Sequence, residues 1–154
     1  MAEDKKGRVE TRSVKGAWDV KYKWRFDVAM MEKYVASLKD KKVTGTKCPD
    51  CGRVYAPPTD LCGKCYQSLT EWVEVKDEAE LVMYTVGYTS ITGEAFEEPI
   101  ITGMIRFKGS DSWFLAGVKG VKPEDVKPGM KLKPHWRDEP KGQLGDIEYF
   151  VAAD

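Results

Sequence analysis

The chain has 154 residues, a length typical of one domain or two small ones. Hydrophobic residues make up 42% and charged residues 32%, an ordinary water-soluble composition, and no apolar run approaches the ~20 residues that cross a membrane. The charges cancel over the whole chain, but residues 1–47 carry 13 Lys/Arg and 7 Asp/Glu (net +6) and residues 48–154 carry 12 and 18 (net −6). An acidic folded part disfavours DNA or RNA as the main partner.

Residues 1–24 are predicted to form an N-terminal arm. The first 17 residues are polar and lack the apolar core of a signal peptide, so we expect a cytoplasmic protein with reduced thiols. The aromatic residues Trp18, Tyr22 and Trp24 follow. Two interpretations remain open: the rings pack on their own domain, or they lie on the surface of a partner, because aromatic anchors are enriched at interfaces.

Residues 25–42 have the pattern of an amphipathic helix. Phe26, Met30, Tyr34 and Leu38 recur every four residues and therefore share one face. We expect this face to cover a core or a partner.

Residues 43–70 contain all four cysteines of the chain, Cys48, Cys51, Cys62 and Cys65. They form two Cys-x-x-Cys pairs separated by ten residues, a spacing typical of a tetrahedral zinc site of the zinc-ribbon or rubredoxin-like type. Four protein ligands leave no open position, so the site is predicted to be structural. A redox pair or iron is a weaker alternative.

The two knuckles contain glycines. Gly52 follows the first pair and is expected to take a positive φ that tightens the turn, and Gly63 within the second pair is expected to help in the same way.

Residues 71–154 are rich in alternating β patterns, such as "EWVEV", "AELVMYTVGYTS" and "DIEYFVA". Five or six strands without a long intervening helix predict a small antiparallel barrel of the OB type rather than a sandwich. The fold class is therefore α+β and mainly β: an N-terminal helix, a zinc ribbon and an OB-fold barrel.

No catalytic motif accompanies these elements. The single histidine, His135, is more typical of a structural or exposed residue, and the acidic stretch 71–80 is typical of a solvated face. Neither a phosphate loop nor a nucleophile elbow is present. The chain is interpreted as a binding or assembly subunit.

The order of helix, knuckles and barrel resembles the DUF35-type family, which couples a rubredoxin-like zinc ribbon to an OB fold. The segments that carry the resemblance are "GTKCPDCGRVYAPPTDLCGKC" and "EEPIITGMIRFKGSDSWFLAGVKGVKPEDVKPGMKLKPHW". Within the family the chain is most similar to the small subunit of acyl-CoA thiolase complexes, such as the benzoylsuccinyl-CoA thiolase of anaerobic toluene degradation. The resemblance implies a larger thiolase-like partner that holds the reactive Cys and His, and a hetero-oligomer, expected to be a heterotetramer.

In that setting an acyl-CoA ligand is expected at the interface with the partner, and the N-terminal rings are expected to dock on it. Lys21, Lys23 and Arg25 are candidates to contact coenzyme A phosphates, although a solvated face remains the alternative. The loops Thr89–Glu98 and His135–Gly142 are candidates to line the pocket. Two other functions stay open: single-stranded nucleic-acid binding, and acyl-CoA binding without a fixed partner.

Overall fold

The computed structural model describes residues 21–23 and 27–153. Within this part of the chain it contains one α-helix, eight strands and a short 3₁₀ helix. Their bounds are α1 Val28–Lys39, β1 Val43–Lys47, β2 Val54–Tyr55, β3 Glu71–Val75, β4 Ala79–Thr89, β5 Ala95–Phe107, β6 Phe114–Val118, β7 Lys131–Trp136, η1 Leu144–Asp146 and β8 Ile147–Ala152. No helix in the described ranges is long and apolar enough to cross a bilayer.

The helix α1 begins and ends at local signals. The Asp27 side chain accepts a hydrogen bond from the Met30 N–H at 3.0 Å, which caps the N-terminus. Lys41 has φ 55°, a left-handed conformation that a helix cannot continue through. The helix is therefore shorter than the predicted range 25–42, and it buries Tyr34 and Leu38 as its spacing predicts.

The zinc ribbon is built on a three-stranded antiparallel sheet in the order β2-β1-β3. The strand β3, which the sequence placed at the start of the barrel segment, pairs with β1 from Val43↔Val75 to Lys47↔Glu71. Alternation in "EWVEV" predicted the strand correctly, but alternation alone does not identify the neighbouring strand.

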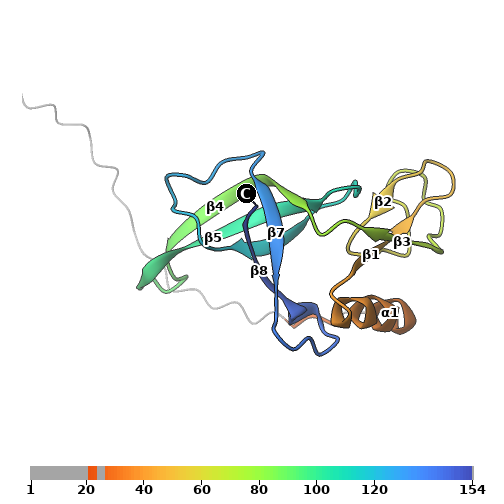
Figure 1. The fold of residues 1–154 in the computed structure, drawn as a ribbon, viewed down its shortest axis with the longest axis horizontal. Helices are drawn as coiled ribbons and strands as arrows, with labels where there is room; N and C mark the ends of the chain where they lie inside the picture. Colours follow the sequence, from red (N-terminus) through yellow and green to blue (C-terminus); the bar gives the residue numbers. More distant parts are fainter. Residues whose placement is uncertain (1–20, 24–26, 154) are drawn as a thin grey trace, which may run out of the picture.

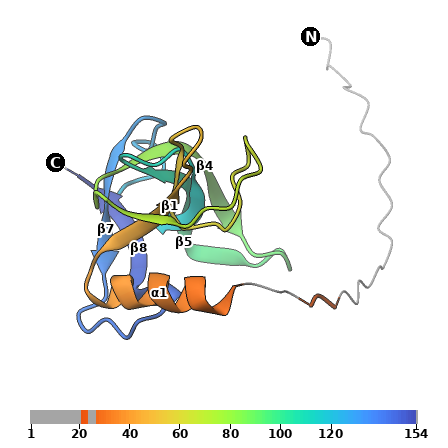
Figure 2. The same ribbon diagram turned by 90° about the vertical axis from the view of Figure 1, so that its right-hand side faces the viewer.

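The remaining strands close into a five-stranded barrel in the order β4-β5-β6-β8-β7. Figure 1 shows this barrel beside the zinc ribbon, with α1 packed beneath the ribbon, and Figure 2 shows the same arrangement from the side. The predicted OB-type barrel is confirmed, with one difference: β6 and β8 run parallel at Val118↔Phe150. A closed barrel of five strands cannot have every neighbouring pair antiparallel, because the strand number is odd; the other four pairs are antiparallel, so β6 and β8 must be parallel.

One continuous core joins the two modules. In the barrel Phe107 and Phe114 stack with ring centroids 5.2 Å apart, and both rings lie 5.7 Å from Phe150. The same cluster includes buried residues of the zinc-ribbon sheet and its flanks, namely Val43, Ala56 and Val75.

The loop between β5 and β6 ties the barrel to β2. The Asp111 N–H donates to the Val54 carbonyl at 2.7 Å, and the Val54 N–H donates to Asp111 Oδ2 at 2.9 Å. The Ala56 N–H lies 2.9 Å from Ser112 Oγ. These hydrogen bonds fix the barrel to the zinc-ribbon module.

Candidate metal centre

The first knuckle is a tight turn around Cys48 and Cys51. The Gly52 N–H donates to the Cys48 carbonyl at 3.0 Å, and the Cys48 N–H donates to the Arg53 carbonyl at 2.8 Å. Gly52 has φ 72°, as predicted, so the chain reverses without a Cβ clash.

The second knuckle repeats this geometry around Cys62 and Cys65. The Tyr66 N–H donates to the Cys62 carbonyl at 2.9 Å, and the Cys62 N–H donates to the Gln67 carbonyl at 2.9 Å. The residue in the left-handed conformation is Tyr66, with φ 59°. The expectation that Gly63 takes a positive φ is wrong, because Tyr66 occupies the position equivalent to Gly52.

The two knuckles bring all four sulfur atoms together. The Sγ atoms of Cys48, Cys51, Cys62 and Cys65 lie within 4.8 Å of one another, and those of Cys51 and Cys62 are 3.7 Å apart. A zinc ion with Zn–S bonds of ~2.3 Å in tetrahedral geometry requires sulfur separations of about 3.8 Å. The donor set and its spacing therefore fit zinc, and all four ligand positions are filled by protein.

Protein groups around the cage tune its thiols. The hydroxyl of Tyr55 lies 3.3 Å from Cys62 Sγ, and this hydrogen bond is the main cause that lowers the pKa of Cys62 to about 6. The backbone N–H groups of Lys64 and Cys65 also donate to this sulfur, both at 3.4 Å. A hydrogen bond between the Cys65 thiol and the Cys51 sulfur favours the protonated form of Cys65, and this hydrogen bond, with burial as the second cause, raises the pKa of Cys65 to about 12. Metal binding requires the thiolate form of each cysteine ligand, so a bound cation would displace this proton.

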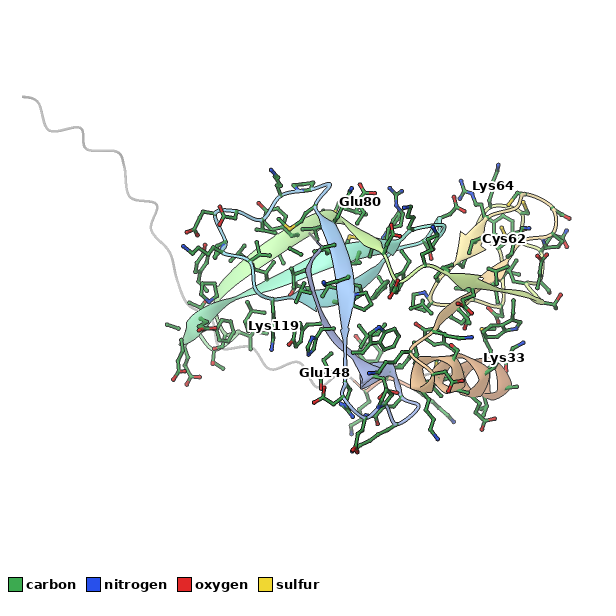
Figure 3. The ribbon with its side chains drawn as sticks, viewed as in Figure 1. Lys33, Cys62, Lys64, Glu80, Lys119 and Glu148 are labelled. Atoms are coloured by element: carbon green, nitrogen blue, oxygen red, sulfur yellow. The ribbon has the colours of Figure 1, made fainter. Side chains whose placement is uncertain are left out.

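Burial completes the site. Cys48 and Cys62 are fully buried and pack with Leu69, while Cys51 and Cys65 are half-buried. Figure 3 shows Cys62 and its neighbour Lys64 in the zinc-ribbon module, apart from Glu80 on the barrel.

Among the other predicted site residues, those that the structure describes do not join this cage. Lys21 and Lys23 are exposed in a segment without regular structure before α1, and Arg25 lies outside the described residues. Trp18 and Trp24 also lie outside them, while Tyr22 is 73% exposed.

His135 takes part in a cross-strand contact on the outside of the barrel. Its ring stacks on Tyr149 at a centroid distance of 4.3 Å with an interplanar angle of 9°, and Lys119 Nζ lies 4.6 Å from the centroid of the Tyr149 ring. The two stacked residues are register partners on β7 and β8, which accounts for the contact without a catalytic role.

Two polar residues of this structure were not identified from the sequence. One is Tyr55, described above. The other is Asp146, a fully buried carboxylate that accepts hydrogen bonds from the N–H groups of Lys141 (3.0 Å), Gly142 (2.7 Å) and Gln143 (3.0 Å). Burial alone would raise the pKa of Asp146, but these donors outweigh it and lower the pKa. Asp146 thereby fixes the loop between β7 and β8.

The acidic side chains of the stretch 71–80 are exposed or half-buried and most of them pair with basic residues, in agreement with the interpretation as a solvated face. Glu80 lies 2.9 Å from Arg106 and Glu78 lies 2.6 Å from Lys108, and both pairs border a surface hollow of about 590 Å³ on the barrel. Ion pairs of this exposed kind add little to stability.

Comparison with known proteins matches both modules. The family model described as the ChsH2 rubredoxin-like zinc ribbon domain matches residues 36–69, and the ChsH2 C-terminal OB-fold domain matches residues 72–137. A DUF35 domain-containing scaffold protein of Methanocaldococcus jannaschii is 30% identical over 108 residues, which cover 68% of this chain and 75% of that protein.

Two solved structures share the fold. One is a DUF35-family protein of unknown function from Sulfolobus solfataricus, with a TM-score of 0.61, 29% identity, and coverage of 79% of this chain and 81% of that one. The other is a chain of the Ltp2-ChsH2(DUF35) aldolase, with a TM-score of 0.54, 19% identity, and coverage of 79% and 93%. The four-cysteine cage, the closed barrel and these matches together show that the chain belongs to the DUF35 family.

Proposed function

We propose that the chain is a non-catalytic subunit that assembles with a larger thiolase-like subunit and helps to form its acyl-CoA site. Membership of the DUF35 family supports an assembly role, because the Methanocaldococcus relative is described as a scaffold protein. The Ltp2-ChsH2(DUF35) aldolase is a solved example in which a chain of this fold occurs in an enzyme with a second component.

The observation that carries this proposal is the placement of the reactive side chains. The sequence contains four cysteines and one histidine, and all four thiols belong to the cage. The histidine stacks on Tyr149 instead of facing a nucleophile. This chain therefore offers no cysteine–histidine pair for nucleophilic catalysis on a thioester, and we place that pair on the larger subunit.

The ion that holds the two knuckles is proposed to be Zn²⁺, one per chain, with a purely structural role. The acyl-CoA ligand would lie where the two subunits meet. The N-terminal arm, with Trp18, Tyr22 and Trp24, would dock on the larger subunit. Residues proposed near the ligand are Lys21, Lys23 and Arg25 for the phosphates, and the loops Thr89–Glu98 and His135–Gly142.

The reaction that we propose for the complex is that of a benzoylsuccinyl-CoA thiolase in anaerobic toluene degradation. The two kinds of subunit are proposed to form a heterotetramer. Affinity purification of the tagged full chain from its native host, with mass spectrometry, is expected to recover one thiolase-like subunit in stoichiometric amount. The reconstituted complex is then assayed for thiolysis of benzoylsuccinyl-CoA and of acetoacetyl-CoA, alongside the isolated chain. Turnover by the isolated chain, or absence of a larger partner, contradicts the proposal. If the complex thiolyses acetoacetyl-CoA but not benzoylsuccinyl-CoA, the assembly role stands and only the assignment as a benzoylsuccinyl-CoA thiolase is contradicted.

A further inference from the structure

The outer halves of β4 and β5 form a two-stranded hairpin, residues 83–100, which we call the projecting ribbon. Figure 1 shows it extending past the other barrel strands at the end away from the zinc ribbon, and Figure 2 views the molecule from the zinc-ribbon end. β4 pairs with β7 only at Ala79 and Glu80, and β5 pairs with β6 only from Ile101 to Ile105. The ribbon therefore leaves the barrel with both outer edges unpaired among the described residues.

The ribbon carries many exposed apolar side chains. Of the thirteen large hydrophobic residues exposed in the described ranges, six lie within these 18 positions: Met83, Tyr84, Tyr88, Ile91, Phe96 and Ile100. The side chain of Ile91 at the tip is fully exposed, and the Phe96 ring lies over Gly87, with Cε2 3.8 Å from the position of a Cβ there.

A hairpin of this composition is poorly stabilised when both its faces are exposed to solvent. A two-stranded hairpin without a third strand or a covering layer is marginally stable at best, and clustered exposed apolar groups mark interaction surfaces in soluble proteins. The barrel core stabilises only the base of the ribbon, where Val86 packs on the buried cluster. Its outer part is arranged to be covered by another surface.

The charge of the ribbon limits what that surface can be. Residues 81–105 contain no Lys, Arg or His, and their only charges are Glu94, Glu97 and Glu98, all exposed. Ribbon-to-ribbon pairing of two copies would bring these carboxylates together, which is unfavourable. Pro99 within β5 lacks an N–H for a further strand to bind, which disfavours simple strand addition at that edge. A complementary surface is apolar in the middle and basic at its border.

We propose that the projecting ribbon is the docking surface for the larger subunit, and that it inserts into an apolar groove of that subunit bordered by lysine and arginine. The inference rests on the proposed function, and it adds a contact with the larger subunit to the proposed place of the segment Thr89–Glu98 near the ligand. Ile91 acts as the apolar anchor, and the three glutamates orient the approach.

The test titrates the purified larger subunit with full-length chains and measures Kd by calorimetry. Ile91→Asp and the triple variant Glu94→Lys, Glu97→Lys, Glu98→Lys are expected to weaken binding by about tenfold or more. Two controls lie elsewhere: Leu144→Asp, at an apolar residue that is also exposed (59%), and the triple variant Glu32→Lys, Asp40→Lys, Asp60→Lys, which changes the net charge by the same amount. The controls are expected to bind within threefold of the wild type.

Each outcome decides a different claim. Ribbon variants that bind as tightly as the controls overturn the ribbon assignment while leaving the assembly role intact. If no larger subunit co-purifies with the wild-type chain, both proposals fail. If the wild-type chain dimerises in light scattering and Ile91→Asp abolishes the dimer, the occupant is a second copy and the assignment to a larger subunit is wrong. Unchanged circular dichroism and metal content establish that the variants fold.

Discussion

Replacing Tyr55 with phenylalanine is expected to weaken metal binding while leaving the four ligands in place. The Gly63 N–H donates to the Tyr55 hydroxyl at 3.0 Å, which leaves the hydroxyl proton to be donated to Cys62 Sγ at 3.3 Å. The variant removes this bond and retains the ring. Groups that hydrogen-bond to metal ligands typically contribute tenfold to a hundredfold to metal affinity.

The structure places the effect at the lower end of this range. Cys62 Sγ keeps two other donors, the N–H groups of Lys64 and Cys65, both at 3.4 Å. The Tyr55 bond is the shortest of the three, and it makes the largest contribution to the lowered pKa of Cys62. We therefore expect about a tenfold loss of zinc affinity.

The measurement is a competition titration against a chromophoric zinc chelator at constant pH. Tyr66→Phe is the matched control, since it removes a hydroxyl from the same knuckle at a side chain that is 74% exposed. An affinity for Tyr55→Phe within twofold of both the wild type and the control would refute the reasoning, because the hydroxyl would then contribute nothing to the thiolate.

Three further predictions concern stability. Asp146→Asn is expected to lower the melting temperature at neutral pH. Because the folded-state pKa of Asp146 is depressed, the stability that the carboxylate contributes is present above about pH 4 and is lost as the pH falls further. The difference in melting temperature between the wild type and the variant should therefore become smaller in acid. Gly45→Ala places a Cβ against the carbonyl oxygen of Tyr55 and is expected to cost about 1–3 kcal/mol in urea unfolding, whereas Gly63→Ala, with only ordinary contacts, is tolerated. Phe150→Ala, at the centre of the ring cluster, should cost about 3–5 kcal/mol in the same assay; a loss under 1 kcal/mol would contradict the described core.

The metal cage and the fold class could be predicted because they depend on local spacing. Two Cys-x-x-Cys pairs determine which atoms meet, and alternation identifies the strands of a barrel. The left-handed conformation of Gly52 could be predicted from its residue type, because glycine favours a positive φ. Tyr66 has the equivalent conformation, but it could not be predicted, because tyrosine rarely takes a positive φ.

The features that were missed depend on pairs of residues distant in sequence. The bond between Val54 and Asp111 joins positions 57 residues apart, and the pairing of β3 with β1 joins positions from 24 residues apart (Lys47↔Glu71) to 32 residues apart (Val43↔Val75). The projecting ribbon also depends on distant pairing. The segment "AELVMYTVGYTS" predicts a long strand, but only the pairing of this strand with β5 and β7 shows that its outer half lies outside the barrel.

The shared core and the Asp111–Val54 tie have a mechanical consequence. The same apolar cluster runs from Val43 at the start of β1 in the zinc-ribbon sheet to Phe150 inside the barrel, so neither module can rotate without opening the cluster. The chain thus behaves as a stiff spacer that holds the zinc ribbon and the barrel in a constant relative position. A protein that contacts both the zinc ribbon and the barrel is therefore held in one orientation relative to the chain.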